Sequence, residues 1–502
     1  MTFKSGAAKI FSKYIHLKNQ KWTQHPLEAQ QRIFAELIET GRNTAFGKEH
    51  SFTKINTYED FKNAVPLADY ENLKPYIERI IQGETDVLWK GIPLYFAKTS
   101  GTTSGEKLIP ISKESMPYHI QAARDALLEY IHKSGHADFV SGKMIFLQGS
   151  PALKEINGIK TGRLSGIVAH YVPKYLQKNR MPGEETNCIE DWETKVDKIV
   201  DETIKEDMTL ISGIPPWLVM YYERLIKKSG GKKIKELFPN LRLMVTGGVN
   251  YNPYREKMKE LIGNDIDVIQ TYPASEGFFG YQDSLNSEDL LLLVNHGIFY
   301  EFVEADTFFT ENPKRIDLKE VELDKDYALI LNTNAGLWAY NIGDTIRFTS
   351  LKPYRIVVSG RIKHFTSAFG EHVIAHEVEK AIEECLKKFP AQVSEFTIAP
   401  QVNPQEGLPY HEWLIEFAKE PENQDLFAEE LDRNMRKLNA YYDDLVSGSI
   451  LKPLVITKIK ENGFNDYMKA MGKLGGQNKT PRLSNDRKIA DEFYKLDLVK
   501  LQ

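Results

Sequence analysis

The middle of the sequence alternates short apolar segments with longer amphipathic ones, and this alternation limits the possible folds more than any other feature. Apolar periodicity typical of helices is found at 115–134 and 253–262. Strands are expected at 93–98, 107–112, 143–147, 241–245 and 266–272. Alternating strands and helices predict an α/β fold, in which ligands bind at the carboxyl ends of the strands.

A second, smaller unit is expected at the C-terminal end. The chain of 502 residues is too long for one hydrophobic core, so it should form at least two domains. A β-rich stretch at 327–348 is followed, after Gly360-Arg361, by the pattern of an α+β unit. Helices are expected there at 376–388 and 426–445, with a strand at 412–417.

The segment from Thr99 to Lys107 has the composition of a phosphate-binding loop. It reads Thr-Ser-Gly-Thr-Thr-Ser-Gly-Glu-Lys. Glycines allow backbone N–H groups to approach an anion, hydroxyls donate hydrogen bonds, and the lysine adds a positive charge. It is not a Walker loop, because Gly101 and Gly105 are four residues apart and Leu108 follows the lysine. The alternative is a surface hairpin rich in Ser, Thr and Gly.

Three further segments carry groups suited to a nucleotide, although each has a structural alternative. Tyr272-Pro-Ala-Ser-Glu276-Gly277 follows a predicted strand and brings an aromatic ring, a hydroxyl and a carboxylate onto one loop. One carboxylate beside substrate phosphates is a common way to hold Mg²⁺. Gly247-Gly248 would let a flat ring approach the backbone, and Asp344 could accept both ribose hydroxyls. The alternatives are a core tyrosine, a plain turn and a turn-capping aspartate, respectively.

In this order, the segments resemble the motifs of the adenylate-forming superfamily, which includes acyl-CoA synthetases, luciferases and peptide-synthetase adenylation domains. Thr99–Lys107 matches its phosphate loop, Tyr272–Glu276 its aromatic-x-x-[Ser/Thr]-Glu motif, and Tyr340–Asp344 its Tyr-x-x-Gly-Asp motif. Gly360-Arg361, followed by Gly370 and a helix containing Glu379, matches its hinge motif.

Within that superfamily the chain most resembles the Gretchen Hagen family of acyl acid–amido synthetases, as a bacterial-type member. The likeness lies in the Ser-Gly-Thr-Thr-Ser-Gly-Glu-Lys loop, the Tyr-Pro-Ala-Ser-Glu form of the second motif, and the late segment Gln477-Asn-Lys-Thr-Pro-Arg482. The chain departs from the superfamily at Asn341, where arginine is common, and at Lys363-His364, where acidic residues are frequent.

The resemblance implies a role for each matched residue. It implies that the β- and γ-phosphates are held by Thr99, Ser100, Gly101, Thr102, Thr103, Gly105 and Lys107. It implies that the adenine is flanked by Gly247, Gly248, Tyr272, Pro273 and Ala274. It places Ser275 at the α-phosphate, Glu276 on Mg²⁺, and Asp344 and Arg361 on the ribose.

The resemblance also implies a mobile C-terminal domain. Residues 1–360 would bind ATP and the acyl substrate, 361–364 would form a hinge, and 365–502 would rotate about it. That domain would deliver a lysine for adenylation, with Lys479 as the best match and Lys473 as the alternative. The acyl pocket is least defined. Trp217 is a candidate for its wall, although a core tryptophan is the other interpretation.

The implied activity is ATP-dependent adenylation of a carboxylic acid, which yields an acyl adenylate and pyrophosphate. Transfer of the acyl group to an amine, as in an amino acid, would then form an amide. An acyl-CoA ligase would use the same first step with a thiol acceptor. A regulatory protein that binds ATP without turnover is a third hypothesis. The identities of the acid and the amine and the oligomeric state do not follow from the sequence.

The composition limits which classes of partner and which cellular compartment are expected. With 65 basic and 70 acidic residues, a formal net charge of −5, no general basic face for nucleic acid is expected. Cys188 and Cys385 are far apart, which argues against disulfides or a zinc site and fits a reducing cytoplasm. Residues 1–20 lack the apolar core of a secretory signal, and no apolar run approaches the ~20 residues of a membrane span. A cytoplasmic protein without a membrane partner is expected.

Overall fold

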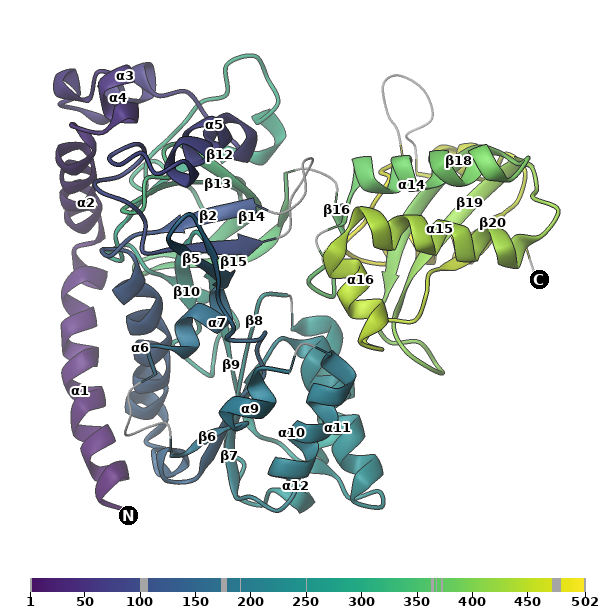
Figure 1. Cartoon of the computed structure of the whole chain (residues 1–502), viewed down its shortest axis with the longest axis horizontal. Helices are drawn as coiled ribbons and strands as arrows, with labels where there is room; N and C mark the ends of the chain where they lie inside the picture. The colour runs from purple at the N-terminus through teal and green to yellow at the C-terminus, as the bar shows by residue number, and fades with distance from the viewer. Residues whose placement is uncertain are drawn as a thin grey trace.

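A computed structural model describes residues 2–99, 107–172, 178–189, 191–249, 251–362, 365–366, 368–371, 373–471 and 480–500. A large lobe contains the N-terminal and central parts of the chain, and a smaller lobe contains the C-terminal part (Figure 1). The expected α/β fold with a smaller α+β unit is confirmed.

Helices form the N-terminal part. They are α1 (Phe3–Gln24), α2 (Pro26–Gly41), α3 (Ala45–Glu49), η1 (Phe52–Lys54), α4 (Tyr58–Ala64) and α5 (Tyr70–Ile81). α2 buries an apolar stripe that includes Ile33 and Leu37. Thr57 and Asp69 begin α4 and α5 with reciprocal capping boxes, which satisfy backbone N–H groups of each first turn.

The largest sheet crosses the large lobe and joins a parallel half to an antiparallel half. Its strand order is β12 (Ile298–Glu304), β13 (Asp326–Thr333), β14 (Tyr340–Leu351), β15 (Tyr354–Arg361), β11 (Leu290–Leu292), β10 (Gly277–Tyr281), β9 (Asp267–Ala274), β8 (Leu243–Gly247), β7 (Met208–Gly213), β3 (Lys143–Phe146) and β6 (Arg180–Met181). The pairs from β6 to β9 are parallel, whereas β9 to β12 pair antiparallel. The carboxyl ends of β7, β8 and β9 therefore share one edge.

Helices and a second sheet flank this large sheet. The second sheet has the order β2 (Lys107–Ile111), β1 (Tyr95–Thr99), β5 (Ile159–Arg163) and β4 (Lys154–Ile156). The longer flanking helices are α6 (Met116–Ser134), α10 (Trp192–Thr203), α11 (Pro215–Lys228) and α13 (Arg255–Ile262). Shorter turns are η2 (Asp138–Ser141), α7 (Leu164–Ala169), α9 (Glu184–Asn187), α12 (Ile234–Leu237), η3 (Asn252–Tyr254) and η4 (Ala305–Thr307).

The C-terminal lobe packs helices on a short sheet. Its elements are β16 (Phe365–Thr366), β17 (Val373–Ile374), α14 (Ala375–Lys388), β18 (Gln392–Gln401), β19 (Tyr410–Lys419), α15 (Gln424–Leu438), α16 (Ala440–Ser447), β20 (Val455–Ile459), α17 (Gly463–Ala470) and α18 (Lys488–Lys495). The prediction of one helix over 426–445 was wrong. Asn439 adopts an extended backbone and its side chain accepts a hydrogen bond from Tyr442 N, so a new helix begins there.

The two lobes touch directly. The Tyr254 hydroxyl donates to the Ala368 carbonyl at 2.7 Å, and Arg163 pairs with Asp444 while lying over the Tyr441 ring. One cluster of buried apolar side chains also extends from helices α11 and α13 into the C-terminal lobe, where it includes Trp413. The lobes are therefore in contact through both apolar and polar groups.

Buried histidines make the large lobe sensitive to acid. His119 on α6 is 4% exposed, and burial lowers its pKa from 6.5 to about 4. The folded form thus keeps a neutral imidazole where the unfolded chain takes up a proton. Stability attributable to His119 is present above pH 6.5 and is lost as the pH falls toward 4.

We predict that His119→Gln flattens the pH dependence of unfolding. Between about pH 7 and about pH 5, the free energy of unfolding of the native protein should fall by about 2 kcal/mol more than that of the variant. Urea unfolding at both pH values measures this difference. His25→Gln, at an exposed histidine, is the control and should leave the native slope unchanged. Equal slopes for His119→Gln and the native protein would contradict the prediction.

Candidate active site

The ends of β8 and β9 lie side by side at the shared edge of the parallel strands, and β8 ends in a glycine. Gly247, at the end of β8, pairs with Thr271 of β9, and the Thr271 hydroxyl donates to the Thr246 carbonyl at 3.0 Å. A Cβ atom on Gly247 would lie 2.5 Å from Thr271 Oγ1 and 2.8 Å from Thr271 O. Close contact with β9 therefore requires glycine here. Gly248 has a φ of 81°, which also favours glycine.

The Tyr272–Glu276 motif forms one end of a hairpin. Contrary to expectation, Tyr272, Pro273 and Ala274 still belong to β9, and only Ser275 and Glu276 form the turn before β10. The strand continues because Ala274 and Pro273 pair with Gly277 and Phe278. All five motif residues are half-buried. The hairpin holds the Glu276 carboxylate at a tight turn and not on a long loop.

Asp344 lies beside this hairpin. It is 5% exposed and accepts a hydrogen bond of 2.5 Å from the Tyr272 hydroxyl. The backbone of Asp344 pairs with that of Arg361, the last residue of β15. The preceding Gly343 has a φ of 93°, and the pairing of β14 with β13 is irregular at this point. Such a bulge redirects the following side chain, which explains why the motif has glycine before its aspartate.

Tyr340 joins the same strand to Glu276. Its hydroxyl donates to Glu276 Oε1 at 3.4 Å, and its side chain is 1% exposed. Burial, and then the neighbouring Glu276 and Tyr70, hold the pKa of Tyr340 well above its usual value. The hydroxyl therefore stays protonated and remains a donor to the carboxylate.

Tyr70, which sequence reasoning missed, contacts the base of the phosphate-loop segment and lies two residues after Ala68, which bridges to Tyr340. Thr99 and Lys107 pair where β1 and β2 meet the loop. Leu108 N donates to the Tyr70 hydroxyl at 2.9 Å, and Lys107 Nζ lies 5.5 Å from the centre of the Tyr70 ring. No local pattern marks Tyr70, because its role depends on the contact of Ala68 with β14. The loop residues Ser100, Gly101, Thr102, Thr103 and Gly105 lie outside the described residues.

The three predicted motifs thus converge. Tyr70 contacts the base of the phosphate loop, and Ala68, two residues before it, bridges to Tyr340. Tyr340 in turn donates to Glu276, and the same hairpin reaches Asp344 through Tyr272. Tyr70 and Asp344 are 274 positions apart in the sequence (344 − 70), but these segments form one region of the large lobe. The region combines a carboxylate at a turn, a buried aspartate and a lysine at a loop base.

Models of three domains of one protein family match this chain. The model of the GH3 family N-terminal domain matches residues 17–182 and 164–266, that of the central domain matches 291–361, and that of the C-terminal domain matches 376–488. The chain belongs to the GH3 family. The expected resemblance to the acyl acid–amido synthetase family is confirmed.

Relatives of this GH3 chain align over nearly all of its length. A probable indole-3-acetic acid-amido synthetase, GH3.1 of Arabidopsis thaliana, is 22% identical over 94% of this chain and 91% of the relative. Among solved structures, a GH3.15 acyl acid amido synthetase has a TM-score of 0.61 at 16% identity, covering 98% and 97% of the two chains. A 2-hydroxyisobutyryl-CoA ligase has a TM-score of 0.56 at 12% identity, covering 94% and 92%. The structural likenesses establish the fold.

The remaining predicted residues of this GH3 chain are placed only in part. Arg361 ends β15 opposite Asp344. Lys473 and Lys479, like hinge residues 363 and 364, lie outside the described residues. Trp217 lies in the first turn of α11, half-buried against the apolar cluster that continues into the C-terminal lobe. This position is compatible with either of its two interpretations.

The donor set suits Mg²⁺ held mainly by substrate. Within the described ranges, no group of three or more His, Cys, Asp or Glu residues is arranged to hold a metal ion. Mg²⁺ in nucleotide sites commonly uses one or two carboxylates together with phosphate oxygens and water. Glu276, at a turn near the base of the phosphate loop, fits this pattern. In the same described ranges, no helix is long and apolar enough to cross a bilayer.

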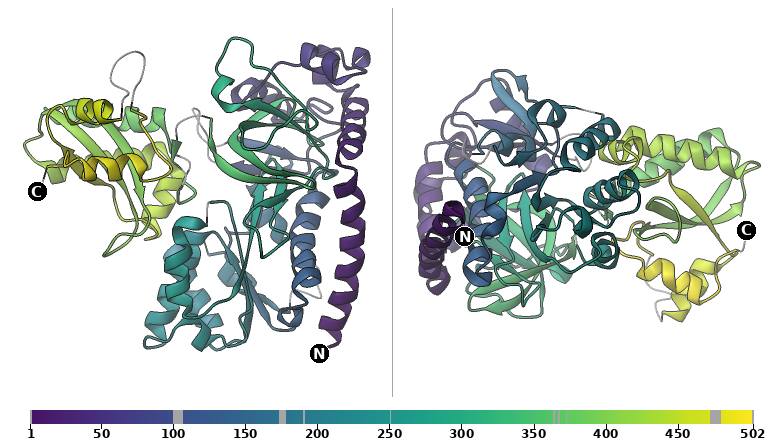
Figure 2. Two further views of the ribbon diagram at one scale, coloured as in Figure 1. Left: turned by 180° about the vertical axis from the view of Figure 1, so that it is seen from behind. Right: turned by 90° about the horizontal axis from the view of Figure 1, so that it is seen from below.

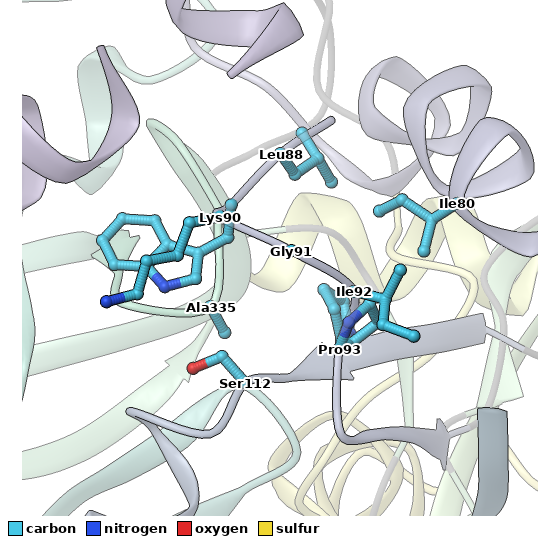
Figure 3. Close-up of a pocket in the computed structure, with 10 residues that line it drawn as sticks. Ile80, Leu88, Lys90, Gly91, Ile92, Pro93, Ser112 and Ala335 are labelled. Carbon is cyan, nitrogen blue, oxygen red and sulfur yellow. The ribbon is translucent and has the colours of Figure 1, made fainter. Parts of the chain in front are cut away.

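A small pocket of the GH3 chain lies apart from this region. It is found near the end of β2 opposite Lys107, and its lining comes mainly from the segment before β1, with Ile80 contributed by α5. Labelled in Figure 3 are Ile80, Leu88, Lys90, Gly91, Ile92, Pro93, Ser112 and Ala335. The predicted site residues that the structure describes do not line it, so we assign it no part in the site.

We predict that Gly247→Ala destabilises the large lobe by about 1–3 kcal/mol, because the added methyl group overlaps backbone and side-chain atoms of Thr271. Thermal unfolding measures the change. Gly6→Ala in α1 is the control, since nothing lies within 4 Å of the added atom. That control should be neutral or stabilising, as alanine favours helix. A Gly247→Ala protein as stable as the native one would show that the strands can separate at this point.

Proposed function

We propose that this GH3 chain activates a carboxylic acid with ATP and transfers the acyl group to an amine, preferably that of an amino acid. In the first step a carboxylate oxygen attacks the α-phosphorus and pyrophosphate leaves. In the second, the amine nitrogen attacks the acyl carbon, AMP leaves, and the nitrogen loses a proton. The convergence of the phosphate-loop base, Glu276 and Asp344 carries this proposal.

The main barrier to the first step is electrostatic, since an anion must approach a polyanion. Fixed positive charge and oriented dipoles offset this repulsion. Lys107 and the hydroxyls and backbone of residues 99–106 would hold the β- and γ-phosphates. Glu276 would hold Mg²⁺, which neutralises phosphate charge when bound. The Tyr340 hydroxyl orients Glu276 and, being buried and protonated, adds no negative charge.

The nucleoside would lie across the ends of β8, β9 and β14. Asp344, which accepts a hydrogen bond from the Tyr272 hydroxyl at 2.5 Å, would hold the ribose. Arg361, whose backbone pairs with that of Asp344, would assist it. Tyr272 packs edge-on against Phe279, with ring centres 4.9 Å apart, which orients its ring. Gly247, Gly248, Pro273 and Ala274 would flank the adenine, and Ser275 would contact the α-phosphate.

The second step would use a different arrangement of the lobes. We propose that residues 1–360 form the ATP- and acyl-binding domain, that 361–364 act as a hinge, and that 365–502 form the moving domain. β15 ends at Arg361 and β16 begins at Phe365, so the chain leaves the large sheet at this segment. Lys479, or alternatively Lys473, would reach the phosphates during adenylation. Trp217 is our candidate for the wall of the acyl pocket.

The acyl-CoA ligase is the second candidate function. A CoA ligase shares the fold, with a TM-score of 0.56, so the fold alone does not choose the acceptor. The relatives named amido synthetases favour the amine, and one of them aligns over 94% of this chain. Amino acids are therefore the first acceptors to test.

We also propose a cytoplasmic location for the enzyme. Cys188 is exposed and Cys385 is buried, and both are free thiols. Burial raises the pKa of the Cys385 thiol to about 12, so it stays protonated and unreactive. Free thiols are typical of a reducing compartment.

We predict that Glu276→Ala loses ATP–pyrophosphate exchange by a factor of about 100 or more, because the site loses the carboxylate that would hold Mg²⁺. The exchange is measured with a panel of carboxylic acids. Glu155→Ala, which removes an exposed carboxylate on β4, is the matched control and should keep full exchange. Undiminished exchange in Glu276→Ala would exclude the metal-binding role of Glu276.

We predict that amino acids, and not coenzyme A, accelerate AMP release once an accepted carboxylic acid is supplied. In the proposed second step AMP leaves only when an acceptor attacks the acyl carbon, so the correct acceptor should raise turnover. AMP and pyrophosphate are measured with each acceptor, and mass spectrometry identifies the amide. Acceleration by coenzyme A alone would favour the thioester-forming ligase. Absence of exchange with every acid would favour a regulatory ATP-binding protein.

A further inference from the structure

Helix α1 carries its large apolar side chains on the outside of the molecule. Phe3, Ile10, Tyr14 and Leu17 are 93%, 77%, 62% and 51% exposed. Their spacing of seven, four and three residues puts them on one helical face. Scattered exposed apolar residues are ordinary, but a continuous stripe of them is typical of a binding surface.

The inner face of α1 is unusually polar, and its contacts fix the rotation of the helix. Asn19 Nδ2 donates to Glu129 Oε1 of α6 at 2.9 Å, and the Trp22 indole donates to Asn19 Oδ1 at 3.1 Å. His16 Nδ1 lies 2.8 Å from the other oxygen of Glu129. Ser5 and Ser12 are also buried. Turning the apolar stripe inward would break these bonds and bury charged groups, so the stripe is held outward.

Positive charge flanks the stripe. Residues 3–24 contain Lys4, Lys9, Lys13, Lys18 and Lys21 and no acidic residue, although the whole chain has a net charge of −5. At 100° per residue, Lys9 and Lys13 lie on one side of the stripe and Lys4 and Lys18 on the other, while Lys21 lies in line with the stripe at its C-terminal end. Within the described chain, none of the five forms an ion pair. The exposed face is thus an apolar line between two rows of unpaired cations.

The position of α1 leaves this face accessible. α1 runs along α6 on the side of the large lobe away from the C-terminal lobe (Figures 1 and 2). Views from behind and from below both place it at the outer edge of the molecule (Figure 2). A broad, flat partner could approach it without contacting the candidate active site or the junction of the lobes.

The positive charge of α1 limits which partner could cover its exposed face. A second copy pairing through α1 would place five lysines against five, with no acidic residue on either helix to offset them. A partner must therefore be anionic and must also accept a straight apolar stripe. An anionic bilayer surface does both, because acyl chains receive the apolar face while headgroups attract flanking lysines. We infer that α1 docks this protein peripherally on an anionic lipid surface.

This inference does not rest on the proposed function, and it modifies one expectation from the sequence. The sequence lacks a spanning segment, from which no membrane partner was expected. Surface docking needs no span. It needs an amphipathic helix whose apolar face is free, and only the packing of α1 on α6 reveals which face that is.

Vesicle flotation of the full-length protein tests the inference. Vesicles of phosphatidylcholine alone are compared with an equimolar mixture of phosphatidylcholine and phosphatidylserine. We expect binding to the mixed vesicles, weakened by salt, and little to the neutral ones. Ile10→Gln combined with Tyr14→Gln should weaken binding, as should Lys9→Gln combined with Lys13→Gln, each by at least about tenfold. Lys48→Gln combined with Lys54→Gln is the charge-matched control and should bind like the native protein.

Two further measurements test whether the variants are folded and whether a partner other than a lipid surface covers the face. Because the substituted side chains point outward, each variant should keep the native thermal unfolding midpoint. Absence of binding to the mixed vesicles, or native-like binding by both α1 variants, would overturn the inference. A dimer of the native protein that Ile10→Gln with Tyr14→Gln converts to monomer, without vesicle binding, would assign the face to a second copy. Binding to polyglutamate in place of vesicles would assign it to an acidic protein.

Discussion

Strand β14 holds the candidate site together, because two of its side chains reach the same hairpin. Tyr340 donates to Glu276 and Asp344 accepts from Tyr272, at 3.4 Å and 2.5 Å. The bulge at Gly343 separates the two contacts and directs Asp344 toward the hairpin. Both partners lie on β9 or its turn, so the hairpin cannot shift without breaking one of these bonds. Preorganised polar groups of this kind stabilise the charge that develops when a nucleophile attacks a phosphate.

The same strand also connects the site to the N-terminal helices. Ala68 bridges to Tyr340 just before α5 begins, which brings Tyr70 against Lys107 and Leu108. The base of the phosphate loop is thereby fixed relative to Glu276, although the two are far apart in sequence. Beyond β14, β15 ends at Arg361 opposite Asp344, where the chain departs for the C-terminal lobe. A change in the arrangement of the lobes would therefore alter the backbone next to Asp344, the proposed ribose-binding aspartate.

Much of the fold follows from local pattern, and the errors have local causes. The strands at 107–112 and 143–147 and the helix at 115–134 appear close to their expected bounds as β2, β3 and α6. The strand expected to end at 272 continues to Ala274, because antiparallel pairing with β10 outweighs the turn-forming tendency of its proline. The helix expected over 426–445 is interrupted at Asn439, whose capping side chain competes with the helical backbone.

The sequence by itself determined the chemical groups of this protein: the hydroxyl- and glycine-rich loop, the carboxylate of Glu276 and the Gly343-Asp344 pair. These depend on residue type and spacing over a few positions. Only the tertiary structure decided which groups meet, since the contacts of Tyr70, Tyr340 and Tyr272 join segments with no sequence relation. It also decided that the apolar side chains of α1 face outward, because hydrogen bonds to Glu129, on another helix, set the rotation of α1.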